Sequence, residues 1–293
     1  MHAYLKAIGF SKVTKRSEMR RIITDVVKNY DEKLTVEDYE DGVFAEFSKN
    51  YGPDCGITVC GQYDENHVFH PEYSFPFFRG TGITTQEQVV VERHAEKESY
   101  AGACDDFRVG VTLIFYLQNP VEYMLEKRRQ GKNFSTDGKP LTLSALASEG
   151  TILLPVQKEK EAVKVEQEKT KNRSHLIEAA RNGDEEAMES LTMEDMDTYS
   201  MISQRIVAED ILSIVDSYFM PYGIECDQYK VLGDILEMNS FQNEVTGEEL
   251  LQMTIESNDM RYDVIINKAD LMGEPAVGRR FKGIVWLQGQ LHL

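Results

Sequence analysis

The chain has 293 residues, of which 41% are hydrophobic and 28% charged, as is typical of a globular protein with room for two domains. Its 32 basic and 50 acidic residues give a net charge of −18, which disfavours non-specific binding of the whole chain to nucleic acid. The first residues do not form a signal peptide, no apolar run reaches the ~18 residues of a membrane span, and 4 cysteines do not make a disulfide scaffold. These features predict a cytoplasmic protein without a membrane partner.

Positive charge is concentrated at the N-terminus. Residues 1–30 carry only two acidic residues, Glu18 and Asp25. A basic edge on an acidic body could dock an acidic partner or a second copy of the chain, although a run of charge more often only solvates a helix face. The basic residues are Lys6, Lys12, Lys15, Arg16, Arg20, Arg21 and Lys28.

An amphipathic helix followed by an antiparallel sheet is expected in the N-terminal half. Ser17 is the predicted N-cap of a helix over residues 18–30, in which apolar residues recur every three or four positions. The strongest strand pattern is 107–118, whose odd positions are all apolar and predict one buried face. The other expected strands are 43–50, 55–63, 67–76, 86–95 and 98–104.

A second helix is predicted after this sheet. Asn119 can cap its start, and Gly131 can end it. Residues 141–147 and 151–156 are expected to add a final hairpin. Residues 1–156 are therefore predicted to form an α+β domain in which helices pack on an antiparallel sheet.

The middle of the chain is expected to separate two domains. Residues 157–173 are highly charged, contain no aromatic residue and predict a linker. Residues 174–217 are expected to be mainly helical, with one helix opening at Ser174 and another near Thr192. The pattern of residues 208–218 fits a helix and a strand equally well.

Residues 218–293 are predicted to form a small β-barrel similar to an OB-fold. Gly233 lies inside the first of its strands and indicates a bulge where a long strand bends around a barrel. Phe281, Val285 and Leu287 share one face of the last strand and are expected to fill the core. The expected strands are 229–241, 248–257, 260–267 and 281–289.

No metal or cofactor site is predicted. Cys55, Cys60, His67 and His70 lie close in sequence, but their spacing turns the two pairs to different faces of strands rather than into tight knuckles. The chain also lacks the glycine-rich phosphate loops of nucleotide-binding proteins.

Glu92, His94, Cys104 and Asp105 are weak candidates for catalysis. If their two strands were neighbours, a thiol, an imidazole and carboxylates could come together, as nucleophilic catalysis requires. The surrounding sequence matches no nucleophile motif. The alternative is a turn at Asp105 and a histidine at a strand end.

The strongest candidate for a binding surface is in the final strand. Lys282 and Trp286 share a face, and Arg279 and Arg280 lie just before them. A cationic edge beside the only tryptophan suits single-stranded nucleic acid or an acidic peptide. The alternative is that Trp286 packs against the helical segment and the basic residues pair with nearby acids, since residues 218–293 contain more acidic than basic residues.

Several segments of the sequence resemble an uncharacterised family of cytoplasmic proteins from clostridia and related Firmicutes. They are MHAYLKAIGFSK at the N-terminus, GVTLIFYLQNPVEYM, YSMISQRIVAEDILSIV and NKADLMGEPAVGRRFKGIVWLQG. The resemblance spans nearly the whole chain and implies a domain of unknown function in a bacterial cytoplasm. It supplies no catalytic residue, substrate or cofactor.

Three functions are compatible with the sequence. The first is a non-enzymatic intracellular binding or adaptor protein that holds a protein partner or a second copy of itself. The second is an enzyme that acts on a small molecule in the N-terminal domain. The third is binding of single-stranded nucleic acid through the C-terminal barrel, which the acidic charge of the chain opposes.

Overall fold

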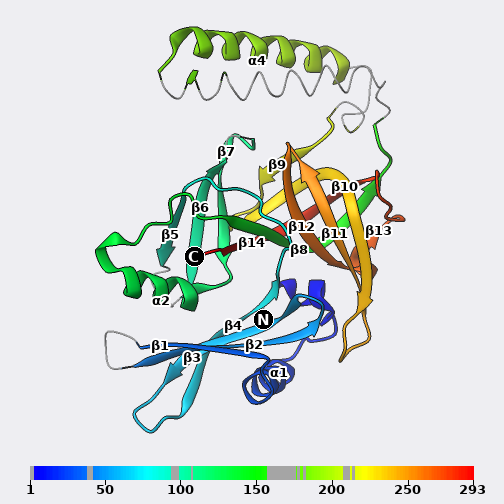
Figure 1. Cartoon of the computed structure of the whole chain (residues 1–293). Coiled ribbons are helices and arrows are strands. Elements are labelled where there is room, and N and C mark those ends of the chain that lie inside the picture. The colour runs from blue at the N-terminus through cyan, green and yellow to red at the C-terminus, as the bar shows by residue number, and fades with distance from the viewer. Residues whose placement is uncertain are drawn as a thin grey trace.

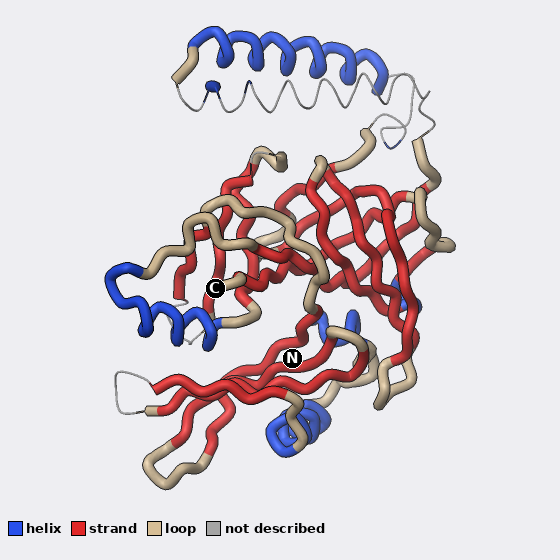
Figure 2. Tube along the Cα trace, in the orientation of Figure 1, coloured by secondary structure: helices blue, strands red, loops and turns tan. Residues whose placement is uncertain are grey.

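The computed structural model describes residues 3–37, 42–93, 99–106, 108–156, 176, 179–180, 183–206, 212 and 215–293. These residues are mostly strand with few helices, as Figure 2 shows. A four-stranded antiparallel sheet lies beside a larger sheet that contains a closed five-stranded barrel (Figure 1). The predictions of an antiparallel sheet and of a barrel are confirmed at this level.

The four-stranded sheet is formed by the first half of the predicted N-terminal domain. Its strand order is β1–β2–β3–β4, and every neighbouring pair is antiparallel. Strands β2 to β4 agree with the predicted strands to within two residues. The strands are β1 (Glu32–Glu37), β2 (Val43–Gly52), β3 (Cys55–Tyr63) and β4 (Phe69–Phe78).

Helical segments cover both faces of this sheet. Helix α1 (Arg16–Lys28) packs on the face turned away from the barrel and buries Val26. The 3-10 helix η1 (Ala3–Ile8) lies between the sheet and the barrel (Figure 1). Ser17 is not the N-cap of α1, because the helix already begins at Arg16 and Lys15 is its N-cap. The Glu18 carboxylate accepts hydrogen bonds from the two backbone N–H groups just before the helix, at 3.0 Å each.

The barrel closes because one strand pairs on both of its sides. Its order is β8–β12–β11–β10–β14, and β14 returns to pair with β8. The β8–β12 pair is parallel, whereas the other four pairs are antiparallel. The strands are β8 (Leu141–Leu153), β10 (Gln228–Gln242), β11 (Glu249–Ser257), β12 (Met260–Asn267) and β14 (Arg280–Leu291).

Further strands extend the barrel sheet. Beyond β14 the order continues with β7, β6 and β5, and the β14–β7 pair is parallel. Short strands also add to β10 and to β8. The added strands are β5 (Val89–Arg93), β6 (Tyr100–Asp106), β7 (Val111–Leu117), β9 (Tyr218–Pro221) and β13 (Leu271–Met272).

The sequence predicted a barrel formed by residues 218–293 alone, but an earlier part of the chain also contributes to it. Strand β8 supplies one of its five strands from the N-terminal side of the predicted linker. The hairpin expected over 141–147 and 151–156 is instead this single strand, because β14 pairs with it from end to end. Gly150, which falls between the two expected strands, lies inside the observed strand, where a Cβ atom would come within 2.5 Å of the Phe281 ring. The OB-like character of the barrel is not evident from this strand order.

Two clusters of buried apolar side chains stabilise the barrel and the four-stranded sheet. The first fills the barrel and contains Phe281, Val285 and Leu287, all fully buried, so the prediction for the last strand is confirmed. The second lies on both faces of the four-stranded sheet and includes Trp286 from the outer face of the barrel. A polar joint links the two layers, since the Gln288 side-chain amide donates to the backbone oxygen of Pro76 at 2.9 Å.

Helices α2 and α4 follow later in the chain. Helix α2 (Pro120–Gln130) ends at Gly131, whose φ of 56° suits glycine, as predicted. Helix α4 (Glu185–Ile206) runs unbroken through Thr192, so the prediction of a helix opening there is wrong. The predicted linker 157–173 and most of 208–218 lie outside the described residues. Among the residues that the structure describes, no helix combines the length and the apolar character needed to cross a membrane.

Gly233 provides a test of barrel packing. It is not at the predicted bulge, which lies two residues further on between Ile235 and Glu237. Its Cα instead approaches the end of β11, where an added Cβ would come within 2.4 Å of the backbone oxygen of Glu256. We expect Gly233→Ala to lower the free energy of unfolding by about 1–3 kcal/mol, as measured by urea denaturation. Gly82→Ala is the control, because open space surrounds that residue; an equal loss in both variants would contradict the packing argument.

Candidate functional site

The residues proposed for catalysis do not converge in the part of the chain that the structure describes. Cys104 is buried on β6, and burial raises the pKa of its thiol to about 12. Asp105 lies on the opposite, exposed face of the same strand, where it accepts a hydrogen bond from Thr112 at 2.5 Å. Glu92 is exposed on β5 and lies opposite Ala101. His94 lies outside the described residues.

The residues proposed as a binding surface are largely buried. Trp286 is 4% exposed, donates from its indole nitrogen to Asp227 at 2.6 Å and stacks on Tyr4, with 5.7 Å between the ring centroids. Its ring could therefore stack on a base only after leaving these partners. Arg279 donates to the backbone oxygen of Glu274, and Lys282 is half-buried.

Arg280, the fourth residue of that predicted surface, has a structural role. Its side chain is buried and donates to the backbone oxygens of Leu154, Val215 and Leu212 at 2.9–3.0 Å. Its three donors therefore fasten the chain where it leaves β8 to the chain where it returns to the barrel.

The cysteine and histidine residues near β3 and β4 do not gather either. Cys55 and Cys60 are buried, whereas His70 is exposed and hydrogen-bonds to Asp64 at 2.9 Å. His67 lies in a turn with a φ of 59°. The described residues contain no group of three or more histidine, cysteine, aspartate or glutamate side chains that could hold a metal ion.

In the charged pair Asp106–Arg108 the carboxylate is buried and the guanidinium is half-buried, and the pair serves a structural purpose. The Arg108 guanidinium donates to Asp106 at 2.5 and 2.8 Å, to the backbone oxygen of Thr84 and to that of Asp259. Burial acts to raise the pKa of Asp106, but the hydrogen bonds from Arg108 hold it below its ordinary value. These hydrogen bonds connect the turn after β6 with the backbone at Thr84 and at Asp259. Both charges of the pair are engaged, so neither is available to a ligand.

Glu46 is the buried polar group that sequence reasoning missed. It lies on β2 between Phe44 and Ser48 on the same face and is 6% exposed. One of its carboxylate oxygens has no hydrogen-bond partner among the described residues. Its cross-strand neighbour is Cys60, which in turn lies opposite Tyr73.

The surroundings of Glu46 favour its neutral form. Burial, together with the nearby carboxylates of Glu32 and Glu122, raises its pKa from 4.5 to about 8, although Arg79 acts in the opposite direction. Burial also raises the pKa of the Cys60 thiol and of the Tyr116 hydroxyl well above their ordinary values. This is a set of neutral, unreactive groups between two sheets, and it lacks an ionised base.

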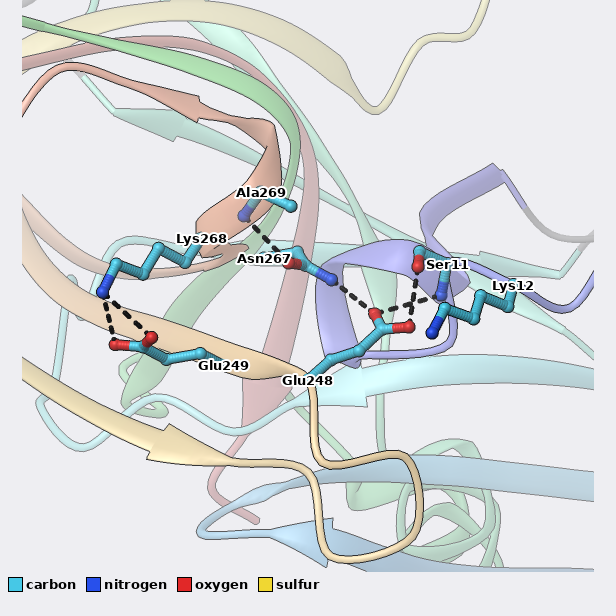
Figure 3. Close-up of a pocket in the computed structure, with 7 residues that line it drawn as sticks. All are labelled: Ser11, Lys12, Glu248, Glu249, Asn267, Lys268 and Ala269. Atoms are coloured by element: carbon cyan, nitrogen blue, oxygen red, sulfur yellow. Dashed lines mark hydrogen bonds and ion pairs between the residues drawn. The ribbon is translucent and has the colours of Figure 1, made fainter.

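A groove lies where the N-terminal segment meets one end of the barrel. Its volume is about 460 Å³, and its lining comes from the segment before α1, from β11 and from the β12–η3 (Lys268–Asp270) corner. Figure 3 shows Glu248 between its partners Ser11 and Asn267. The lining residues are Ser11, Lys12, Glu248, Glu249, Asn267, Lys268 and Ala269.

Most polar groups of this groove already bind one another. Glu248 accepts hydrogen bonds from the Ser11 hydroxyl at 2.7 Å and from the Asn267 amide at 2.6 Å. Lys268 pairs with Glu249 at 2.8 and 2.9 Å. Lys12 is exposed and forms no ion pair with the described residues. These contacts therefore hold the N-terminal segment against the barrel, and Lys12 remains as an exposed cation at the rim of the groove.

That cation belongs to a larger basic surface, which consists of Lys12, Lys15, Arg16, Arg20, Arg21 and Lys28. All six side chains are exposed, and none forms an ion pair with another described residue. Lys6, the seventh basic residue of this region, pairs with Asp270 at 3.1 Å. The structure thus gathers most of the predicted basic edge on α1 and the loop before it.

Comparison with known proteins gives one family. A family model described as "Domain of unknown function, E. rectale Gene description (DUF3881)" matches residues 5–289. Comparison with curated proteins and with solved structures found no match.

The burial of the thiols predicts their reactivity. Cys226 is exposed, whereas Cys55, Cys60 and Cys104 are buried with raised thiol pKa values. Because thiol reagents attack the accessible thiolate, we expect one fast-reacting cysteine in the native protein and four after unfolding. Peptide mapping of the labelled protein identifies the site. Labelling of Cys104 as fast as Cys226 would contradict this picture and would favour an enzymatic function again.

The raised pKa of Glu46 predicts how stability depends on pH. The unfolded chain ionises this carboxyl above pH 4.5, whereas the folded chain keeps it protonated up to about pH 8. Stability is therefore lost as the pH rises between these values and stays constant above them. Glu46→Gln removes this loss, so we expect its gain in unfolding free energy to grow from pH 4.5 to 8 and to reach about 3 kcal/mol at pH 7.

Urea denaturation at several pH values measures this gain. Glu72→Gln, at an exposed position on β4, is the control and is expected to change stability by less than ~0.5 kcal/mol. A gain from Glu46→Gln that did not vary with pH would show that the carboxyl is ionised in the folded protein.

Proposed function

We propose a function for this chain, which belongs to the DUF3881 family, a domain of unknown function, from the distribution of charge on its surface. The protein is a non-enzymatic binding or adaptor protein, and its basic surface on α1 holds an acidic protein partner. The observation that carries this proposal is the set of six exposed cations that form no ion pair within the described part of a chain whose net charge is −18.

The acidic residues of this region support the proposal by their positions. Asp25 accepts hydrogen bonds from Lys49 at 2.6 Å and from Asn29 at 2.7 Å, which lowers the pKa of its carboxyl. Glu18 is engaged at the start of α1, where hydrogen bonds from the backbone lower its pKa. Both carboxylates therefore have hydrogen-bond partners outside the six cationic side chains, although the charges of Lys15 and Arg21 also act on Glu18. The region keeps a large excess of positive charge that can attract a negative surface.

The packing of α1 also suits a binding surface. Val26 is buried, and Met19, Ile22 and Ile23 pack against the apolar cluster beneath. The four basic residues of α1 are consequently held on a packed helix, which reduces the ordering cost of binding. Charge complementarity of this kind increases the rate of association and sets partner choice, and its effect weakens with added salt.

In this proposal the closed barrel is the scaffold. The OB-like ligand face that the sequence predicted would require Trp286 and Arg280 at the surface, and both are buried and hydrogen-bonded. Binding of nucleic acid through that face is not favoured for the same reason.

Charge reversal on α1 tests the proposal. We expect immobilised polyglutamate to retain the protein at low salt and to release it as salt is added. Arg20→Glu combined with Arg21→Glu is expected to weaken this binding about tenfold or more, since each close charge pair contributes roughly 0.2–1 kcal/mol and reversal adds repulsion.

The matched control changes the same amount of charge elsewhere. The control is the double variant Lys132→Glu with Lys139→Glu. Both residues follow α2 in the chain and lie outside the basic surface, so we expect this variant to keep most of the binding. Equal losses in the two double variants would reject the surface. Stronger retention on single-stranded oligonucleotide than on polyglutamate would favour a nucleic-acid partner instead.

A further inference from the structure

Helix α4 carries a surface that is complementary to the basic surface. Glu185 and Glu189 are one helical turn apart, are exposed and form no ion pair with a described residue. Ala187, which is 4% exposed, lies on the opposite side of the helix. At 100° per residue, Met196 falls on the same outward face as the two glutamates, with Met188 and Met193 at its edges.

The exposed methionines distinguish this face from an ordinary solvated one. Met193 and Met196 are 64% and 69% exposed. Methionine is flexible and polarizable, and it is frequent on surfaces that bind other proteins. The aliphatic stems of arginine and lysine can pack on such side chains while their charges reach the neighbouring carboxylates.

The spacing of charges agrees between the two helices. Arg16 and Arg20 on α1 are separated by four residues, as are Glu185 and Glu189 on α4. Four residues span about 6 Å along any α-helix, so two ion pairs can form at once when the helices lie side by side. Side chains at this spacing share one face of their helix.

The two helices lie at opposite ends of one molecule. Helix α1 lies beneath the four-stranded sheet, and α4 lies at the opposite end, beyond the barrel (Figure 1). From this arrangement, and resting on the proposed function of the basic surface, we infer that the acidic partner of α1 is the outward face of α4 in a second copy of the chain. The contact is head-to-tail, so each copy keeps one α1 and one α4 available for the next.

Two electrostatic effects oppose each other in this contact. Each copy carries a net charge of −18, so whole molecules repel one another at low salt, where charges interact over long distances. Near physiological ionic strength the Debye length falls to about 8 Å, which screens this repulsion more than the close ion pairs. Self-association should therefore be strongest at intermediate salt and should decline again above ~0.5 M.

Exchange of charges between the helices provides the test. Sedimentation velocity of the full-length protein, up to concentrations on the order of 10⁻⁴ M because such contacts are weak, compares the wild type with two reversed variants. The first is Arg16→Glu with Arg20→Glu, and the second is Glu185→Lys with Glu189→Lys. Each variant alone is expected to lose self-association about tenfold or more, and an equimolar mixture of the two is expected to regain it.

The outcomes separate this inference from the proposed function. Wild type that stays monomeric at all salt concentrations, or a mixture that does not associate, overturns the α1–α4 contact. So does a loss of association in the α1 variant only. If polyglutamate binding still depends on Arg20 and Arg21 in these cases, the basic surface stands and its partner is another acidic protein. If that dependence is also missing, both proposals fail.

Discussion

The pairing of β14 with β8 is the interaction on which the rest of the structure depends. It runs from Arg280 opposite Leu153 to Leu291 opposite Leu141, and it closes the barrel by joining strands that are more than one hundred residues apart in sequence. An open sheet would leave two edges exposed, whereas closure pairs every barrel strand on both sides. Because β14 also pairs with β7, the same strand carries the outer extension of the sheet.

This closure positions the N-terminal layer as well. The outer face of the barrel presents Leu146, Ile265 and Trp286 to the cluster shared with the four-stranded sheet. Residue Gln288 reaches across to β4, where it accepts from the backbone N–H of Phe78 at 3.2 Å and donates to Pro76. The basic surface on α1 is therefore attached to the barrel through the four-stranded sheet, which packs on the barrel.

Local elements could be predicted from the sequence because their causes are local. Strand-like composition between turn residues identified 55–63 to the residue, and alternation of side chains identified 260–267. The glycine at 131 marked the end of α2 because a left-handed backbone favours glycine. The core position of Phe281 followed from the same alternation.

Long-range arrangement could not be predicted in the same way. Ser148–Gly150 has the composition of a turn, and only the presence of β14 alongside makes it strand. The sequence left Trp286 open between a binding surface and a packed position, because nothing in its own strand reveals the stack on Tyr4 or the bond to Asp227. Glu46 was missed because a carboxylate in a strand normally indicates a solvent-facing position, and here that position faces a second layer. The basic surface was found because unbalanced charge is visible in composition.

The side chain of Arg280 has a consequence for how this architecture can vary. It fastens both ends of the stretch between β8 and β9 to the barrel rim, through Leu154 on one side and Leu212 and Val215 on the other. The entropy cost of closing a loop rises only slowly with its length. A change in the length of the chain between these anchor points should therefore cost the barrel little stability.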